Sequence, residues 1–234
     1  MSQALTITLP QKPPPNSRKP GWTSAVAARP ELIVFTGILL ILNAPMLVGS
    51  SWSSMTFEKA LVLEGEWWRL LTHPFVHVSW YHLLLDATAF LTLYASLLDK
   101  SFIRRLSYII AGAAGSLIVA CTAFTRPVQS LCGLSGIAHG LMAVSALEMI
   151  TQTSADSATR RVGWISFMLV VGKAGFEAFT GKMFFQFLHF GLLGQPVAIS
   201  HAGGIVGSMT VWLWFKTFPA ISNSAVKPRS SRDN

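Results

Sequence analysis

The chain has 234 residues, of which 51% are hydrophobic and 12% are charged, and its mean hydropathy is +0.49. Soluble domains carry about twice this proportion of charged residues, so the composition argues against a soluble globular protein. The two cysteines are too few for a disulfide-stabilised fold, and the sequence contains no repeat of solenoid length.

Four long segments without Asp, Glu, Lys or Arg account for the high hydropathy. They cover residues 32–57, 106–125, 127–147 and 183–215, and each is long enough to cross a bilayer core. With two weaker segments, they predict an all-α membrane protein with six transmembrane helices, at residues 31–49, 79–98, 105–124, 133–150, 162–179 and 197–217. Asp86 interrupts the second predicted span, and Lys173 with Glu177 interrupts the fifth. We expect these ionisable side chains to face the interior of the bundle.

The positive charge is distributed unevenly along the chain. If the amino terminus is cytoplasmic, thirteen Lys and Arg residues fall on the inner side, four fall on the outer side, and Lys173 lies within the membrane. This distribution predicts that both termini are cytoplasmic. It also explains the net charge of +8 as a topology signal, so we predict no nucleic-acid partner.

The segments outside the predicted spans differ in character. Residues 1–30 are rich in proline and basic residues and predict a disordered cytoplasmic tail before the membrane domain at 31–217, and a second basic tail is predicted at 218–234. No cleavable secretory signal precedes Glu31, so we expect the chain to insert through its first span. The first outer loop, residues 50–78, carries several Trp and aliphatic residues and predicts a segment lying in the membrane interface.

A serine at the start of the fourth predicted span is the first candidate for chemistry. It lies in the segment Gly133-Leu134-Ser135-Gly136. Glycine allows a sharp turn and a close approach to a substrate carbonyl, while the helix start leaves backbone N–H groups free to bind negative charge. A nucleophile and its oxyanion hole can share such a turn. The alternative is an ordinary close helix contact, because Gly and Ser also mark such contacts in membranes.

A histidine near the outer end of the sixth span is the predicted partner of this serine. His201 lies at a depth similar to that of Ser135, and small residues spaced four apart line both helices. These residues are Gly136 and Gly140 on the fourth span, and Gly203 with Gly207 or Gly204 with Ser208 on the sixth. Contact between the small faces would bring His201 within reach of the serine hydroxyl, as general-base catalysis requires. The alternative is a structural histidine bonded to a backbone carbonyl.

Two histidines and an aspartate surround the start of the second span. His82 and Asp86 are four apart and share a helix face. His82 either stabilises a developing oxyanion or is a polar residue at the helix entrance. On a continuous helix His77 and His82 would point about 140° apart, so we predict no metal site, and no cofactor is predicted.

Taken together, these residues resemble the rhomboid family of intramembrane serine proteases over most of residues 31–217. The resemblance is carried, in rhomboid order, by Trp68-Arg69, Thr72-His73, His77 and His82, Gly133-Leu134-Ser135-Gly136, and His201 followed by Gly204. The continuation to His139-Gly140, and the pair Lys173 and Glu177, resemble more specifically the rhombosortase branch.

The resemblance implies a six-helix rhomboid-like bundle in which Ser135 is the nucleophile and His201 the general base of a dyad, with no acid required. The backbone amide of Ser135 and the His82 side chain would hold the oxyanion. It further implies a bacterial inner-membrane enzyme that acts through an acyl-enzyme. Its partners would be the lipid bilayer and the transmembrane segment of an anchored substrate, cut near the periplasmic surface. The rhombosortase branch narrows the substrate to proteins with a carboxyl-terminal GlyGly-type anchor.

Two positions depart from the rhomboid pattern. Asp86 stands where most rhomboids have an asparagine that donates to the oxyanion, and a carboxylate there would repel this charge unless it is protonated or paired with His82. We expect the pairing. His139, one turn after Ser135, stands where many rhomboids have a tyrosine, and we assign it a packing or positioning role. The alternative functions are a catalytically inactive rhomboid-like protein that binds or escorts membrane clients, and a small transporter.

Two further pairs have more than one interpretation. Lys173 and Glu177 are four apart, and we interpret them as neutralising each other inside the bundle, with gating or substrate recognition as the alternative. Cys121 and Cys132 lie near the predicted outer surface, and the sequence does not decide whether they form a disulfide.

Overall fold

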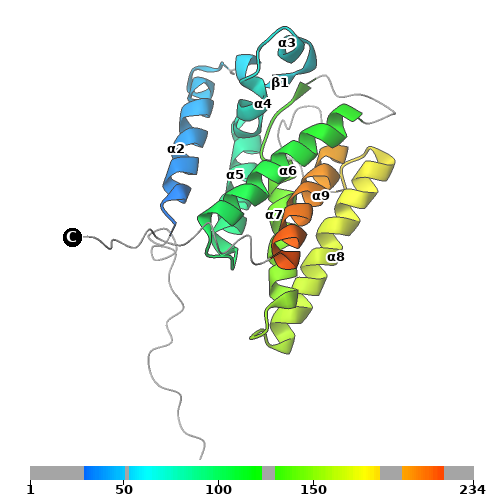
Figure 1. The fold of residues 1–234 in the computed structure, drawn as a ribbon. Coiled ribbons are helices and arrows are strands. Elements are labelled where there is room, and N and C mark those ends of the chain that lie inside the picture. The colour runs from blue at the N-terminus through cyan, green and yellow to red at the C-terminus, as the bar shows by residue number, and fades with distance from the viewer. Residues whose placement is uncertain (1–28, 51–52, 123–129, 185–196, 219–234) are drawn as a thin grey trace, which may run out of the picture.

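The computed structural model describes residues 29–50, 53–122, 130–184 and 197–218 (Figure 1). The α-helices are α2 (Glu31–Asn43), α3 (Lys59–Leu63), α4 (Arg69–Thr72), α5 (Trp80–Ser96), α6 (Phe102–Thr122), α7 (Ser135–Thr151), α8 (Ser157–Thr180) and α9 (Ala198–Thr217). Short 3-10 helices are η1 (Ala44–Val48), η2 (Ser53–Met55) and η3 (His73–Phe75). Strands β1 (Phe57–Glu58) and β2 (Ser130–Leu131) pair antiparallel. The predicted tails lie outside the described residues except for residues 29, 30 and 218.

Long helices lie at each of the six positions where the sequence predicts a span. Of these, Glu31–Val48, Phe102–Thr122 and Ser157–Thr180 are long and apolar enough to cross a membrane, which makes the chain a multi-pass membrane protein. Helices α5 and α7 have 17 residues each. That all six helices cross, with both termini in the cytoplasm, stays a prediction.

One boundary that differs from the prediction is the start of α8. The apolar pattern predicts a start at residue 162, whereas the helix begins at Ser157. The cause is a capping interaction, because the Asp156 side chain accepts a hydrogen bond of 2.7 Å from the backbone N–H of Thr159. This cap extends the helix into polar sequence that a hydropathy pattern does not detect.

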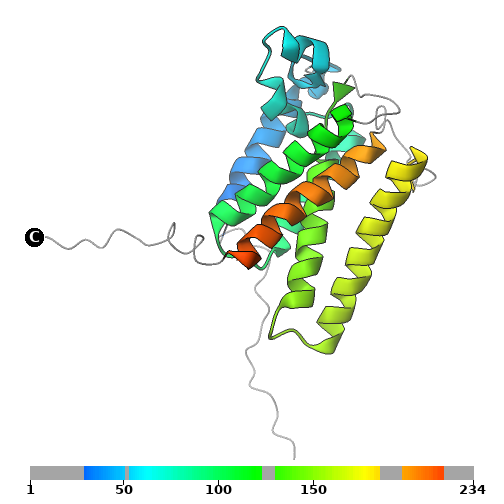
Figure 2. The same ribbon diagram turned by 45° about the vertical axis from the view of Figure 1, so that its right-hand side comes forward.

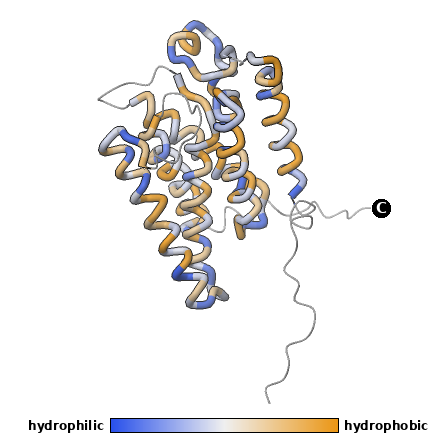
Figure 3. Tube along the Cα trace, turned by 180° about the vertical axis from the view of Figure 1, so that it is seen from behind, coloured by the Kyte–Doolittle hydropathy of each residue, from blue (hydrophilic) through white to orange (hydrophobic). Residues whose placement is uncertain are grey.

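The outer surfaces of the helices carry apolar side chains. Ile33 and Ile41 on α2 are 64% and 67% exposed, and Ile165 and Leu169 on α8 are 60% and 61% exposed. In Figure 3, hydrophobic residues follow the helices, and hydrophilic ones gather at the turn between α7 and α8 and in the segment before α5. Such broad apolar surfaces are expected where helices face lipid.

Helix α9 packs closely against two neighbours through glycines on two of its faces. A Cβ atom on Gly204 would lie 2.0 Å from the carbonyl oxygen of Gly136 on α7, and one on Gly203 would lie 2.3 Å from that of Gly115 on α6. The face with Gly204 therefore contacts the fourth predicted span, and the face with Gly203 contacts the third. The predicted contact of small faces with α7 is correct for Gly204 and Ser208, while Gly203 and Gly207 contact α6 instead.

The first loop is folded over the end of the bundle where α7 and α9 begin (Figures 1 and 2). The buried Arg69 guanidinium donates to the backbone oxygens of Ser53 and Thr56, both at 2.7 Å, and pairs with Glu66 at 2.6 Å. The side-chain oxygen of Asn43 accepts the backbone N–H of His77 at 2.9 Å, which joins the end of α2 to the segment before α5. These interactions fix the loop above the site that is described next.

Candidate active site

Ser135 is the first residue of α7 and lies two residues after Gly133, whose backbone conformation favours glycine. Gly133 has φ +98°, and a Cβ atom there would lie 2.9 Å from both Asp86 Oδ2 and His82 Nε2. The backbone N–H of Gly133 donates to the carbonyl of His73 at 3.0 Å. No side chain caps the start of α7, so its first amide groups stay available to an anion. The sharp turn expected before Ser135 is confirmed.

His201 lies in the first turn of α9, at the same end of the bundle, and is 6% exposed. Its Nδ1 atom lies 2.6 Å from Glu177 Oε2 on α8. The Glu177 side chain is fully buried, pairs with Lys173 Nζ at 2.7 Å and accepts the backbone N–H of Phe184 at 3.0 Å. The predicted pairing of Lys173 with Glu177 is therefore correct, but it is only part of the arrangement.

His139 contacts both parts of the predicted dyad. Its ring stacks on that of His201, with centroids 4.0 Å apart and planes 9° apart. Its Nδ1 atom lies 2.7 Å from the carbonyl oxygen of Ser135, and its Nε2 atom lies 2.9 Å from Lys173 Nζ. A carbonyl can only accept and an ammonium can only donate, so His139 is a neutral imidazole with its proton on Nδ1. Both nitrogens are occupied, which leaves neither to take a proton from Ser135.

No direct bond completes the dyad in the described part of the chain. Neither Ser135 Oγ nor His201 Nε2 makes a hydrogen bond to another described residue. The two residues are nevertheless held close by the α7–α9 contact and by the stacked ring of His139. Hydrogen bonds between catalytic groups are often long or absent before substrate binds.

His77, His82 and Asp86 converge on one point, which corrects the argument made from helical angles. Both histidine Nε2 atoms face Asp86 Oδ2, at 3.4 Å from His77 and 3.3 Å from His82. The 140° separation does not apply because His77 precedes α5, whose N-cap is Ser79. The three groups are close enough to share a metal ion, so the geometric objection to a metal site here was wrong.

The Asp86 carboxylate lies near both rings without a hydrogen bond from its Oδ2 atom. The distances from Oδ2 to the two Nε2 atoms are within ion-pair range, but their angles do not meet the geometry of a hydrogen bond. Asp86 Oδ2 therefore has no hydrogen-bond partner among the described residues. The backbone of Gly133 packs directly on the cluster. A second group, His139, Glu177 and His201, also has its ligand atoms close together, but the ammonium of Lys173 already contacts two of them.

Titratable groups in the loops next to the site are held neutral by burial. Burial lowers the pKa of His73 to about 4. It also lowers the pKa of His77, against the opposing effect of Asp86. Burial, with the charge of Asp86, raises the pKa of the Cys132 thiol to about 11. At neutral pH this thiol is protonated, which argues against a thiolate nucleophile, and Cys121 and Cys132 form no disulfide.

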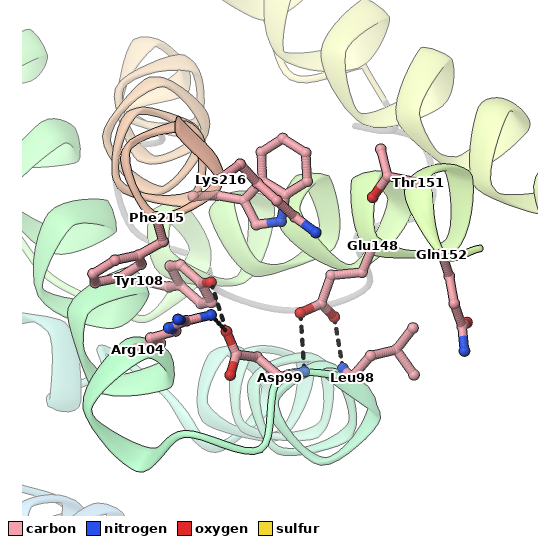
Figure 4. A pocket seen from close by; sticks show the side chains of 10 residues that line it. Leu98, Asp99, Arg104, Tyr108, Glu148, Thr151, Gln152, Phe215 and Lys216 are labelled. Carbon is pink, nitrogen blue, oxygen red and sulfur yellow. Dashed lines mark hydrogen bonds and ion pairs between the residues drawn. The ribbon is translucent and has the colours of Figure 1, made fainter. Parts of the chain in front are cut away.

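Two cavities of different character lie at the two ends of the bundle. A cavity of about 10 Å³ beside Ser135 is lined by residues that include His73, Ser116 and Ser200, and this volume is close to the space that one water requires. A cavity of about 280 Å³ lies at the opposite ends of α7 and α9 (Figure 4).

The larger cavity contains charges that are compensated within the fold. Glu148 accepts the backbone N–H groups of Leu98 and Asp99, at 2.6 and 3.1 Å, and Arg104 pairs with Asp99 at 3.6 Å (Figure 4). These contacts tie the end of α5 to α6 and α7. The charged residues of the larger cavity therefore have a structural explanation, and the candidate active site is the one near Ser135.

Sequence reasoning missed the contacts of Glu177 with His201 and of Lys173 with His139. The available signal was the spacing of four between two charged residues on one membrane helix, which must turn toward the bundle interior. This spacing predicts which face of α8 is buried, but it does not predict which helices that face contacts.

Comparisons with known proteins show a similarity that includes the candidate site. A family model described as a rhomboid domain matches residues 64–218, which is more than half of the chain and includes α4 to α9. RHOMBOID-like protein 5 from Arabidopsis thaliana is 30% identical over 112 residues. That similarity covers 45% of this chain and 36% of the relative, so it extends over little more than a third of the relative's length.

Proposed function

This chain belongs to the rhomboid family, and from that premise we propose that it is an intramembrane serine endopeptidase with Ser135 as nucleophile and His201 as general base. The observation that carries the proposal is the contact of α7 with α9. The backbones of Gly136 and Gly204 touch, one residue after Ser135 and three residues after His201. Helices this close allow a hydroxyl and an imidazole from different spans to come within reach of each other.

In the proposed reaction His201 Nε2 takes the proton of Ser135 Oγ while this oxygen attacks the scissile carbonyl. The C–N bond then breaks as the imidazolium returns the proton to the leaving amine, which leaves an acyl-enzyme on Ser135. Water, activated by the same imidazole, hydrolyses the ester. The oxyanion is proposed to be stabilised by the backbone N–H of Ser135 and the His82 side chain, and the proposal is supported by the position of both beside the turn at Gly133.

The substrate is proposed to be a membrane-anchored protein cut near the periplasmic surface of a bacterial inner membrane. The narrower proposal, a rhombosortase acting at carboxyl-terminal GlyGly-type anchors, rests on the Gly133-Leu134-Ser135-Gly136 segment with His139 and on the pair Lys173 and Glu177. Both similarities to known proteins extend to the rhomboid family and not to this branch.

The proposal is tested by labelling the detergent-solubilised protein with a serine-directed fluorophosphonate. We expect the wild type to become labelled and Ser135→Ala to stay unlabelled, because the probe bonds only to an activated serine. Ser107→Ala is a matched control, since the Ser107 hydroxyl donates to the carbonyl of Ile103 within its own helix and has no other partner among the described residues. A folded wild-type protein that is not labelled would favour the inactive, client-binding alternative.

Asp86 is proposed to act by holding His82 as a cation through their 3.3 Å ion pair. We therefore expect Asp86→Asn to retain substantial activity, within about tenfold of the wild type, because an amide can itself donate to the oxyanion. The measurement is the rate of fluorophosphonate labelling. Loss of labelling in a folded Asp86→Asn protein beside an active wild type would show that the carboxylate has another role.

A further inference from the structure

We infer that Glu177 is a positioning residue that orients His201, so that the reaction centre is a Ser135–His201–Glu177 triad rather than a dyad. This inference rests on the proposed function. The family resemblance implied that no acid is required, and the spacing of Lys173 and Glu177 predicted that they neutralise each other. The 2.6 Å contact of Glu177 Oε2 with His201 Nδ1 gives it a second task.

The carboxylate determines which nitrogen of His201 carries the proton. A carboxylate only accepts, so His201 donates its Nδ1 proton to Glu177, and its Nε2 keeps the lone pair that a general base requires. When Nε2 takes the serine proton the ring becomes positive, and the adjacent carboxylate stabilises this charge. Glu177 thus favours both the reactive tautomer and the charged intermediate.

The ring of His201 is fixed in two directions by different helices. Glu177 on α8 holds its edge, and the stacked ring of His139 on α7 covers its face. The three helices are joined below the site by an apolar cluster that includes Ala143, Ala174 and Ile205. His201 therefore has little freedom to turn away from α7, as a preorganised base requires.

Glu177 is itself held in one orientation. Its Oε1 atom lies 2.7 Å from Lys173 Nζ and accepts the backbone N–H of Phe184. Its Oε2 atom lies 2.6 Å from His201 Nδ1 and also accepts from Lys173 Nζ at 2.9 Å, so both oxygens are fixed. Lys173 compensates the charge of a side chain that is fully buried. A pair needed only for neutralisation would not require the additional contact with an imidazole.

The decisive substitution is Glu177→Gln. Each oxygen of Glu177 accepts from two donors, so the amide NH₂ group of glutamine would face a donor in either orientation, and the negative charge beside His201 would be lost. With the NH₂ group toward His201 Nδ1, the histidine proton moves onto Nε2 and the base is lost, and with the amide oxygen there, no carboxylate charge stabilises the imidazolium. We expect the maximal rate of fluorophosphonate labelling to fall by roughly 10²- to 10⁴-fold, with little change in the probe concentration that gives half of this rate.

Two further variants separate positioning from stability. Glu148→Gln removes another buried carboxylate, 13 residues from Ser135 on the same helix, and should label at the wild-type rate. If Glu177→Gln folds poorly because Lys173 is left unpaired, the double variant Lys173→Met with Glu177→Gln should restore the yield of folded protein. We expect its labelling to stay slow.

A wild-type labelling rate in folded Glu177→Gln, or in the double variant, would overturn the triad. Equal losses in Glu148→Gln would also overturn it, because the effect would then belong to any buried carboxylate. The proposed function fails on a different result, namely a wild-type protein that is not labelled at all.

Discussion

His201→Ala is expected to abolish fluorophosphonate labelling, whereas His139→Phe should retain it. Removal of a general base typically costs about 10²- to 10⁴-fold in rate. In His201, Nδ1 contacts Glu177 and Nε2 stays available to take a proton, whereas both nitrogens of His139 are occupied. Phenylalanine at 139 keeps an aromatic ring against His201 and loses only the bonds to Lys173 and the Ser135 carbonyl, so we expect a decrease of no more than about tenfold.

The comparison is made on proteins of equal thermal stability, by following labelling over time at one pH. Exogenous imidazole offers a control, because a small base entering the space left by His201→Ala should recover part of the rate. The reverse pattern, an active His201→Ala and an inactive His139→Phe, would assign the base to His139 and contradict the proposed dyad.

Gly204→Ala is expected to destabilise the protein and inactivate it together. The new Cβ atom would lie 2.0 Å from the carbonyl oxygen and 2.6 Å from the carbonyl carbon of Gly136, and these are backbone atoms that cannot rotate aside. Helices α7 and α9 must separate, which moves Ser135 away from His201. Overpacking of this kind costs about 1 to 3 kcal/mol or more, and we expect a lower melting temperature with labelling close to background.

Gly172→Ala provides the matched control for this substitution. Gly172 lies within α8, where an added Cβ atom would have no neighbour within 4 Å, and alanine favours a helix over glycine. Its stability and labelling should equal or exceed those of the wild type. Full activity in Gly204→Ala would show that the α7–α9 contact does not set the distance between nucleophile and base.

The proposed reaction centre combines groups from four helices, and two of these helices contribute charged side chains. Helix α7 supplies Ser135 and His139, α9 supplies His201, α8 supplies the pair Lys173 and Glu177, and α5 supplies His82 and Asp86. Charged groups are costly inside a membrane unless they are paired. Here each one contacts an oppositely charged group or a histidine, so the same contacts that make burial tolerable also orient the imidazoles.

The sequence by itself determined the membrane class and the positions of the long helices, and it supplied the residues from which the reaction centre is proposed. Uncharged stretches of bilayer length can only be helices in lipid, and glycine and serine at a helix start are local signals. The local patterns are wrong at two element boundaries. His77 lies outside the helix that begins at Trp80, so helical angles do not apply to it, and α8 begins at Ser157, before the apolar pattern, because of a polar cap.

Only the tertiary structure decided which faces meet. The spacing of Lys173 and Glu177 shows that both turn inward, but it does not show that Glu177 contacts His201. Nor does it show that Gly203 packs against α6 while Gly204 packs against α7. These pairings depend on the rotation and separation of helices that are far apart in the chain. Such quantities are set by the fit of all side chains in the bundle at once, so no single segment of the sequence contains them.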